Sequence, residues 1–268
     1  MEKSSFYPNH DSTYQEFLNK GHAFLFKAAG EYRWWRNDNR KHFNRNIEKL
    51  RYYVDYPITY KINKQLYRCE FDFDDIKGKD VDLALGCSHT LGVGHTLENT
   101  WPNVLSKRTN RTIINLGLSG TGAEMSYLNL KRFISFFNVK NVFHYQPIYS
   151  RYYFYDGHIH KTFLVTKSEL DSIPYKEDYV KEILVSDEFI YHNHYRSIDA
   201  CKGVCNDYGV NYYHINEGPE NREYYWGKGV SDAHFISEVL ENDVPARDLA
   251  HFSVNALKAI GNKFYFMI

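Results

Sequence analysis

The stretch Val81-Asp-Leu-Ala-Leu-Gly-Cys-Ser-His-Thr90 is a short apolar run that ends at a glycine and leads into a serine. An apolar run of this length, bounded by glycine, is typical of a buried strand. Similar runs occur at residues 112–115, 140–145 and 210–215. Helical patterns lie between the runs, at residues 101–107, 123–137 and 198–208. Strands that alternate with helices predict an α/β fold, in which a mostly parallel sheet forms the middle of three layers.

In such a fold, ligands bind beyond the carboxyl ends of the strands, so residues that directly follow a strand are candidates for chemistry. Ser88 is one of these. A sharp turn there would point its hydroxyl out of the sheet, close to the backbone N–H groups of the next helix. Gly86 would relieve crowding in the turn. A serine that only caps the next helix fits equally well. Cys87, a rival nucleophile, is expected to point away from Ser88.

Two further segments carry polar groups or glycines at useful positions. The run Asn115-Leu-Gly-Leu-Ser-Gly120-Thr-Gly122 predicts a tight strand-to-helix loop, and it matches neither a P-loop nor a dinucleotide fingerprint. Near the end of the chain, Asp248 and His251 are three residues apart and would lie on the same side of a turn. A carboxylate so placed can orient an imidazole toward a nucleophile. A helix cap beside an ordinary surface histidine is the alternative.

Taken together and in this order, these segments resemble the sequence blocks of the SGNH hydrolases, also called GDSL-type esterases or lipases. Residues 86–90 are similar to the Gly-Asp-Ser block of that family, residues 115–120 to its second block, and residues 248–251 to its Asp-x-x-His block. Residues 62–70 and Trp101-Pro102 are also similar to segments of some members. The resemblance runs from about residue 58 to about residue 133, resumes near residue 246, and covers under half of the chain.

The resemblance implies a flavodoxin-like sheet and a serine esterase mechanism. By it, Ser88 attacks an ester carbonyl, His251 accepts and returns the proton, and Asp248 orients His251. The backbone amides of Ser88 and Gly120 would hold the oxyanion. We expect the substrate to be an acetyl or other short acyl ester of a carbohydrate or small molecule, and we expect no metal or organic cofactor.

The chain departs from the family pattern in two places. Cys87 stands where the family has an acidic residue, which is not a member of the triad. The family's third block, Gly-x-Asn-Asp, has no counterpart in residues 144–151, so its oxyanion-binding Asn is missing. Gln146 either supplies an equivalent amide or is simply a polar residue at a strand end. Arg151 and His89 are expected to contact the substrate.

The chain is expected to divide into an N-terminal extension, residues 1–79, and a main domain, residues 80–268. In the extension, a helix is expected near residues 17–25 and a hairpin at residues 58–71. The basic and aromatic stretch 32–41 is interpreted as a surface helix that packs its tryptophans on the main domain, in preference to a nucleic-acid-binding segment. The aromatic-rich insert at about residues 149–195 would form a lid or substrate wall, or bury its rings.

Composition excludes several classes of protein. Of the 268 residues, 43% are hydrophobic, which is too many for a disordered chain. Equal numbers of basic and acidic residues, 33 each, argue against a uniformly basic nucleic-acid or membrane binder. Four cysteines are too few for a disulfide scaffold. No apolar run approaches the ~20 residues needed to cross a bilayer, and the first residues lack the apolar stretch of a signal peptide, so the expected location is the cytoplasm. The oligomeric state is left open.

Three other functions compete with hydrolysis. A metal enzyme would use His158 with His160, or His192 with His194. Each pair would lie on one side of a strand. Neither pair is accompanied by the further Cys or His motifs that zinc sites have. Cys201 and Cys205 are better explained as a core-facing helical stripe. An inactive, glycan-binding module would keep the hydrolase fold without turnover. An O-acyltransferase would pass the acyl group of the serine to an alcohol.

Overall fold

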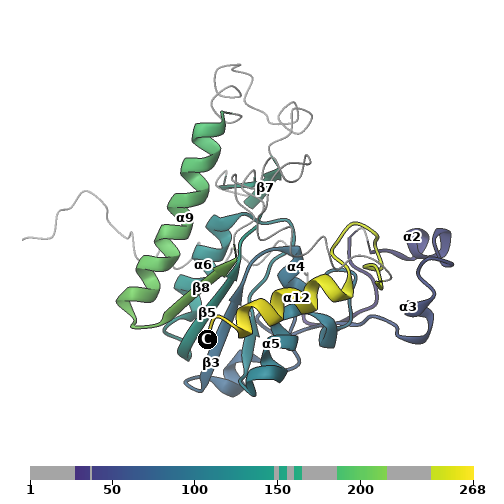
Figure 1. Cartoon of the computed structure of the whole chain (residues 1–268), viewed down its shortest axis with the longest axis horizontal. Coiled ribbons are helices and arrows are strands. Elements are labelled where there is room, and N and C mark those ends of the chain that lie inside the picture. The colour runs from purple at the N-terminus through teal and green to yellow at the C-terminus, as the bar shows by residue number, and fades with distance from the viewer. Residues whose placement is uncertain (1–27, 37, 148–150, 156–159, 165–185, 216–242) are drawn as a thin grey trace, which may run out of the picture.

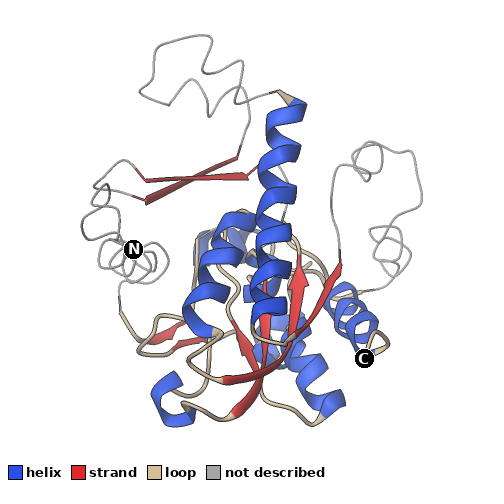
Figure 2. Ribbon diagram, turned by 90° about the vertical axis from the view of Figure 1, so that its left-hand side faces the viewer, coloured by secondary structure: helices blue, strands red, loops and turns tan. Residues whose placement is uncertain are grey.

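The computed structural model describes residues 28–36, 38–147, 151–155, 160–164, 186–215 and 243–268. Its centre is a sheet of four parallel strands in the order β4-β3-β5-β8 (Figures 1 and 2). The strands are β3 (Asp80–Leu85), β4 (Ile113–Asn115), β5 (Asn138–Tyr145) and β8 (Asn211–Ile215). All four apolar runs therefore form strands, as the sequence predicts.

Helices cover both faces of this sheet (Figure 1). On one face, Ala84 and Phe143 pack with residues of α5 (Trp101–Thr109) and α12 (Val254–Tyr265). On the other face, Leu83 and Val142 pack with residues of α6 (Ala123–Phe133) and α9 (Asp187–Asp207). Neighbouring residues of a strand point to opposite faces, so each strand contributes side chains to both hydrophobic cores. The result is the expected three-layer α/β/α fold.

The order of the strands fixes where a ligand can bind. The chain leaves β3 through α5 on one face, whereas it connects β4 to β5 through α6 on the other face. The connections therefore diverge between β3 and β5, which makes the carboxyl ends of these two strands the natural binding crevice. Ser88 and Gln146 follow β3 and β5 respectively, so both belong to this edge.

The described part of the N-terminal extension packs on the same core. Strand β1 (Gly30–Tyr32) pairs antiparallel with β2 (Tyr60–Ile62), and two short helices, α2 (Arg40–Arg45) and α3 (Tyr52–Asp55), lie between them in the chain. Its buried residues share one hydrophobic cluster with Leu83 of the central sheet: Leu50, Tyr53, Ile58, Tyr60, Ile62, Tyr67 and Phe73. The last of these opens a short 3-10 helix, η1 (Phe73–Ile76).

The interpretation of residues 32–41 as a helix is wrong. Strand β1 ends at Tyr32, and Trp35 and Asp38 exchange two backbone hydrogen bonds of 2.8 and 3.0 Å that close a tight turn. Helix α2 begins only at Arg40, because the Asn39 side chain accepts the N–H of His42 and caps the helix there. Trp35 does pack inward, against the main core. The helix expected near residues 17–25 lies outside the described residues.

Other boundaries also differ from expectation. The hairpin at residues 58–71 is reduced to β2, an isolated bridge between Ile62 and Arg68, and a hydrogen bond of 3.1 Å from Cys69 to Lys61. Helix α6 ends at Phe133, four residues early. Helix α9 begins at Asp187, inside the segment assigned to the insert, because Ser186 caps it. A hairpin of β6 (Arg151–Tyr155) and β7 (His160–Leu164) also lies in that segment.

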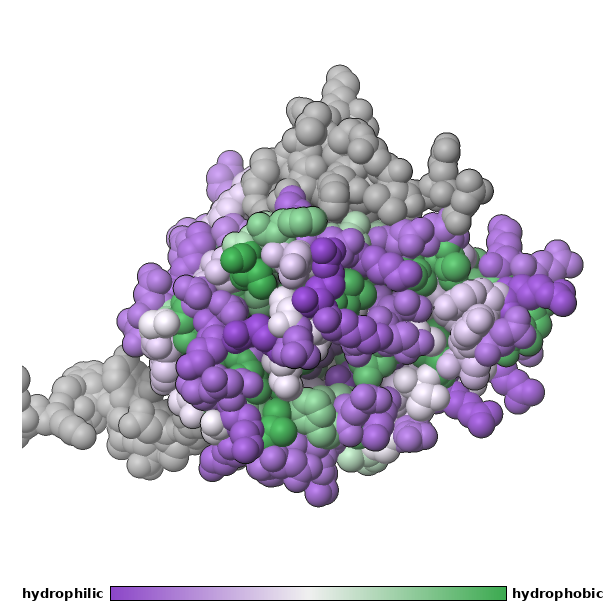
Figure 3. Space-filling view, turned by 60° about the horizontal axis from the view of Figure 1, so that its bottom comes forward, coloured by the Kyte–Doolittle hydropathy of each residue, from purple (hydrophilic) through white to green (hydrophobic). Residues whose placement is uncertain are grey.

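The surface is that of a protein with mixed polarity. The face in Figure 3 is mostly hydrophilic, with hydrophobic residues in small separate groups. Among the helices that the structure describes, none has the length and apolar character needed to cross a membrane.

Candidate active site

The chain turns sharply between β3 and the short helix α4 (Ser88–Leu91). Gly86 has a φ of +148°, and a Cβ atom built on it would lie 2.1 Å from Thr90 Oγ1 and 2.5 Å from the Tyr145 carbonyl oxygen. A side chain does not fit there, so glycine is required for the turn. The turn makes Ser88 the first residue of α4, at the carboxyl edge of the sheet, with 4% of its surface exposed.

The Ser88 hydroxyl donates a hydrogen bond to Cys87 Sγ, at 3.8 Å. The expectation that Cys87 points away from Ser88 is therefore wrong. The alternation of a strand no longer applies at this position, because the strand ends at Leu85. No hydrogen bond between Ser88 and His251 is formed within the described structure, and hydrogen bonds of this catalytic type often tighten only when substrate is bound.

Asp248 and His251 form a hydrogen-bonded acid–base pair at this edge. Asp248 Oδ2 is 2.6 Å from His251 Nδ1, and Asp248 Oδ1 accepts the backbone N–H groups of Ala250 and His251. Burial alone would raise the pKa of Asp248, but the hydrogen bonds and the charge of His251 hold it below its ordinary value. The carboxylate therefore stays ionised and holds the Nδ1 side of the His251 ring. Between them, Leu249 has a φ of +54°, a strained conformation typical of functional turns.

Several contacts hold this tail segment against the residues that follow Ser88. The N–H of Arg247 donates to the Gly94 carbonyl at 2.9 Å, and His95 Nε2 donates to the Phe252 carbonyl at 2.6 Å. His89 stacks on Phe252 with ring centroids 3.8 Å apart, and its centroid is 5.1 Å from that of His251. The first and last motifs of the sequence are thus neighbours in space.

The second loop lies beside the nucleophile turn. The Asn115 side chain donates to the Thr90 carbonyl at 2.7 Å and accepts the N–H of Gly117 at 2.9 Å. Within the described structure, no carbonyl accepts the backbone N–H of Ser88 or of Gly120. Both amides are therefore free to donate to a ligand at this edge.

Gln146 is buried, with 1% of its surface exposed. Its backbone N–H donates to the Ile215 carbonyl at 3.1 Å, and its side-chain amide donates to the phenol oxygen of Tyr212 on β8. The Tyr212 phenol also lies 2.7 Å from His144 Nδ1. In this conformation the Gln146 side chain is therefore hydrogen-bonded to a residue of β8, while its Oε1 is buried without a hydrogen-bond partner.

The two predicted substrate contacts, His89 and Arg151, lie close to the pair described above. Burial, followed by the charges of His251 and Arg151, lowers the pKa of His89 well below its ordinary value, so His89 is neutral. Its Nδ1 is buried without a partner. Arg151 opens β6, and its carbonyl oxygen would lie 2.4 Å from a Cβ atom on Gly122. Arg151 therefore lies across the end of the second loop.

Sequence reasoning missed a buried network that joins the extension to the tail. Asp38 accepts two hydrogen bonds from Arg247, at 2.6 Å from Nε and 2.7 Å from Nη2, and a third from the Tyr60 hydroxyl at 2.5 Å. The Tyr60 oxygen in turn accepts the N–H of Gly94 at 2.8 Å. Arg247 directly precedes Asp248, so this network fixes the position of the Asp248–His251 pair.

Glu124, in the first turn of α6, is expected to make the free energy of unfolding depend on pH. Burial raises its pKa from 4.5 to about 7, against the opposing effects of its own backbone N–H and of Arg196. The folded carboxyl keeps its proton to higher pH than the unfolded one, so the free energy of unfolding falls as the pH rises from 4.5 through 7. The loss due to this group is on the order of 3 kcal/mol.

Denaturant unfolding of the wild type and of Glu124→Gln at pH 5 and pH 8 measures this loss. Between pH 5 and pH 8, the free energy of unfolding should fall less in Glu124→Gln than in the wild type, by on the order of 3 kcal/mol, because glutamine has no proton to lose. Glu48→Gln, at an exposed glutamate, is the matched control and should follow the wild type. Equal decreases in all three proteins would contradict the assignment to Glu124.

The candidate metal ligands that the structure describes do not form a metal site. Within the described part of the chain, no three His, Cys, Asp or Glu side chains are grouped as metal ligands would be. His192 and His194 lie on α9 and not on a strand, so residues two apart point to different sides, one exposed and one buried. His158 lies outside the described residues. Cys201 and Cys205 are fully buried in the core, as expected for a core-facing stripe.

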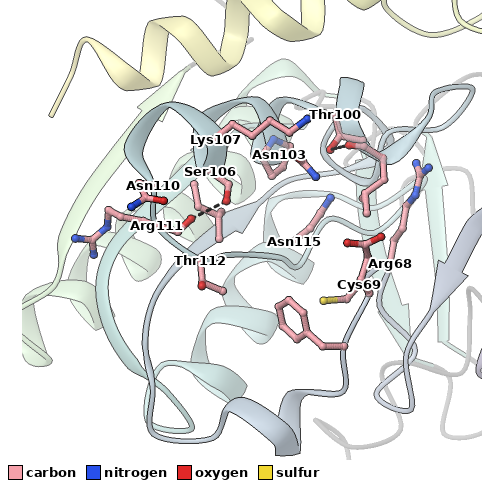
Figure 4. Close-up of a pocket in the computed structure, with 15 residues that line it drawn as sticks. Arg68, Cys69, Thr100, Asn103, Ser106, Lys107, Asn110, Arg111, Thr112 and Asn115 are labelled. Atoms are coloured by element: carbon pink, nitrogen blue, oxygen red, sulfur yellow. Dashed lines mark hydrogen bonds between the residues drawn. The ribbon is translucent and has the colours of Figure 1, made fainter.

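A polar cavity of about 400 Å³ lies on another part of the molecule (Figure 4). Residues 68–71, helix α5 and the start of β4 line it, whereas Ser88 and His251 do not. Two of its basic residues have partners already, because Arg68 donates to the carbonyls of Gly92 and His95, and Arg111 forms two hydrogen bonds with Asp82.

Comparison with known proteins gives only distant similarity. No protein-family model and no curated protein matches the chain. Among solved structures, the chain is similar to a lipolytic protein of the G-D-S-L family from Desulfitobacterium hafniense, with 15% identity, a TM-score of 0.40, and coverage of 71% of this chain and 99% of the other. It is also similar to the psychrotrophic esterase EstA from Pseudoalteromonas sp., with 12% identity, a TM-score of 0.32, and coverage of 70% and 95%.

Proposed function

We propose that the protein is a serine ester hydrolase that removes an acetyl or other short acyl group from a carbohydrate or another small ester. The observation that carries the proposal is the Asp248–His251 pair, hydrogen-bonded at 2.6 Å and packed against His89, the residue next to Ser88. In this assignment Ser88 is the nucleophile, His251 the general base, and Asp248 the residue that orients His251.

The proposed reaction has two steps. Ser88 Oγ attacks the ester carbonyl carbon while its proton passes to His251 Nε2, and the N–H groups of Ser88 and Gly120 stabilise the oxyanion that forms. His251 then protonates the leaving alkoxide, and the acyl group stays on Ser88. Water, deprotonated by His251, hydrolyses this acyl-enzyme and restores the free serine. One oxyanion donor typically contributes about 3–4 kcal/mol and a general base about 10²–10⁴ in rate.

A fluorophosphonate probe tests the proposal. An activated serine forms an Oγ–P bond and releases fluoride, so mass spectrometry should find one phosphonyl group per chain on Ser88. Ser88→Ala should carry no label. Cys87→Ala is the matched control, because it removes the neighbouring nucleophile, and it should be labelled like the wild type. Label on other residues only, or no label, would contradict the role of Ser88.

A second candidate is a module of the same fold that binds its ligand without turnover. The hydrogen bond from Ser88 to Cys87 favours it, because the serine hydroxyl is not directed at a base. The absence of label in a protein that binds acylated sugars would support this second candidate. Transfer of the acyl group to an added alcohol, at a rate above that of hydrolysis, would instead indicate an acyltransferase.

Gln146 is the proposed replacement for the missing Asn of the family's third block. If its amide rotates to the oxyanion when substrate binds, Gln146→Ala should lower kcat for p-nitrophenyl acetate about 100-fold. Tyr212→Phe is the control, since it removes the present hydrogen-bond partner of Gln146 and leaves the amide in place. A Gln146→Ala protein with wild-type kcat and an unchanged melting temperature would leave Gln146 with no role in catalysis.

A further inference from the structure

Two arginines, Arg36 and Arg151, flank the glycine loop of the candidate site. A Cβ atom on Gly120 would lie 2.8 Å from Arg36 Nη1, and one on Gly122 would lie 2.4 Å from the Arg151 carbonyl. Desolvation, followed by the charge of Arg151, lowers the pKa of Arg36, whose side chain is still exposed at the surface. Like charges in proximity are unfavourable unless an anion accompanies them.

Two of the nearby carboxylates that the structure describes have partners of their own. Asp38 is hydrogen-bonded to Arg247, and Asp248 to His251. Glu124 Oε2 lies beside the glycine loop, 2.7 Å from where a Cβ atom on Gly122 would lie, and burial raises its pKa to about 7, so it is partly neutral near pH 7. In the described part of the chain neither Arg36 nor Arg151 has an ion pair, and Arg151 Nη1 is buried without a hydrogen-bond partner. Among the described residues, no carboxylate is therefore paired with either of the two guanidinium groups.

The backbone at Arg36 adds an independent observation. Arg36 occupies the tight turn closed by Trp35 and Asp38, and its φ of +52° is in the left-handed region. Glycine, asparagine and aspartate adopt this conformation readily, whereas a long side chain is strained there. The strain persists because Asp38 anchors the turn through its two hydrogen bonds to Arg247. A strained position that the surrounding structure enforces is common at binding sites.

We infer that Arg36 and Arg151 bind a carboxylate of the substrate, so that the protein acts on esters that carry an acidic group, such as acylated acidic sugars or hydroxy acids. The inference rests on the proposed function and narrows its substrate class. Guanidinium groups match the planar, two-oxygen geometry of a carboxylate. His89, being neutral and adjacent, adds no charge of its own. The same two cations could also bind a phosphate group, and the experiment below includes a phosphate ester that distinguishes the two ligands.

Kinetics with matched esters test the inference. 4-Acetoxybenzoate and 4-acetoxybenzamide differ in charge on the alcohol side, whereas 4-nitrophenyl hemisuccinate and 4-nitrophenyl butyrate differ on the acyl side. The carboxylate site lies on either the alcohol side or the acyl side of the ester, so only one of the two pairs should show a preference. In that pair, the wild type should have a kcat/KM about 10–100-fold higher for the anionic ester than for the neutral one, the range for charge-assisted hydrogen bonds. Arg36→Gln should reduce that ratio at least 10-fold, mainly through KM. Arg45→Gln, at an exposed arginine of α2, is the control and should keep the wild-type ratio.

Arg36→Gly keeps the experiment interpretable if Arg36→Gln folds poorly. Glycine relieves the left-handed strain, so this variant should melt at the same or a higher temperature and still lose the preference for the anion. An equal loss of kcat on both members of a pair would make Arg36 a donor to the oxyanion and would overturn the inference. A higher kcat/KM for 4-acetoxyphenyl phosphate than for 4-acetoxybenzoate would show that the site binds a phosphate and not a carboxylate.

Binding distinguishes failure of the inference from failure of the proposed function. Calorimetry with 4-hydroxybenzoate and 4-hydroxybenzamide measures the anion preference without turnover, and Arg36→Gln should abolish it. Selective binding without hydrolysis of any ester would refute the esterase and leave the carboxylate site. Hydrolysis with no preference between the paired esters, together with equal binding of the two acids and amides, would refute the carboxylate site and leave the esterase.

Discussion

Replacing Ser88 by alanine is expected to lower kcat for p-nitrophenyl acetate by about 10⁴–10⁶-fold, because the loss of a triad nucleophile removes covalent catalysis altogether. The melting temperature should stay near that of the wild type, since a buried serine with one weak hydrogen bond to sulfur contributes little to folding. Steady-state kinetics and thermal unfolding on the same preparation separate the two effects.

Cys87 provides the decisive comparison. Its side chain is 99% buried and adjacent to Ser88, with its sulfur 3.8 Å from the serine oxygen, so a thiol mechanism would use the same turn. Cys87→Ala should retain most of the activity if Ser88 is the nucleophile. A large loss in Cys87→Ala beside a small loss in Ser88→Ala would reverse the two roles, and equal activity of all three proteins would remove the turn from the mechanism.

The strands could be predicted because burial on both faces leaves a simple pattern. Each central strand packs into two cores, so it appears in sequence as a short apolar run, and the polar residues after it mark the edge where ligands bind. This was enough to predict that Ser88, Gly120 and Gln146 belong to one edge. The closeness of Asp248 to His251 followed from a three-residue spacing, which a single turn suffices to bring together.

Other features depend on partners far away in the sequence. The conformation of Arg33 and of Asp38 depends on Arg247, whose charge pairs with Asp38 across more than two hundred residues, and no local pattern reveals such a pair. Arg36, in the same turn as Asp38, lies beside Gly120 of the glycine loop. The start of α9 was missed for a different reason: the aromatic residues of the insert mask the helical periodicity, and only the Ser186 cap marks the true beginning.

Breaking the Asp38–Arg247 pair is expected to cost about 3–5 kcal/mol in the free energy of unfolding, because each charge is almost fully buried and would lose its partner. Asp38→Ala leaves the Arg247 guanidinium without its carboxylate and the Tyr60 hydroxyl without its acceptor. For a chain of this size the melting temperature should fall on the order of 10 °C. Asp72→Asn, at the exposed ion pair of Asp72 and Lys64, is the control and should change the unfolding midpoint little.

A double-mutant cycle shows why this pair matters for the site and not only for the fold. In Asp38→Asn with Arg247→Met, no buried charge is left unpaired, so much of the lost stability should return. Esterase activity should not return with it, because the turn that carries Arg36 and the segment that carries Asp248 are no longer tied together. Recovery of both properties in the double variant would mean that the pair only stabilises the fold. Recovery of stability alone would identify it as the element that holds the acid–base pair in position.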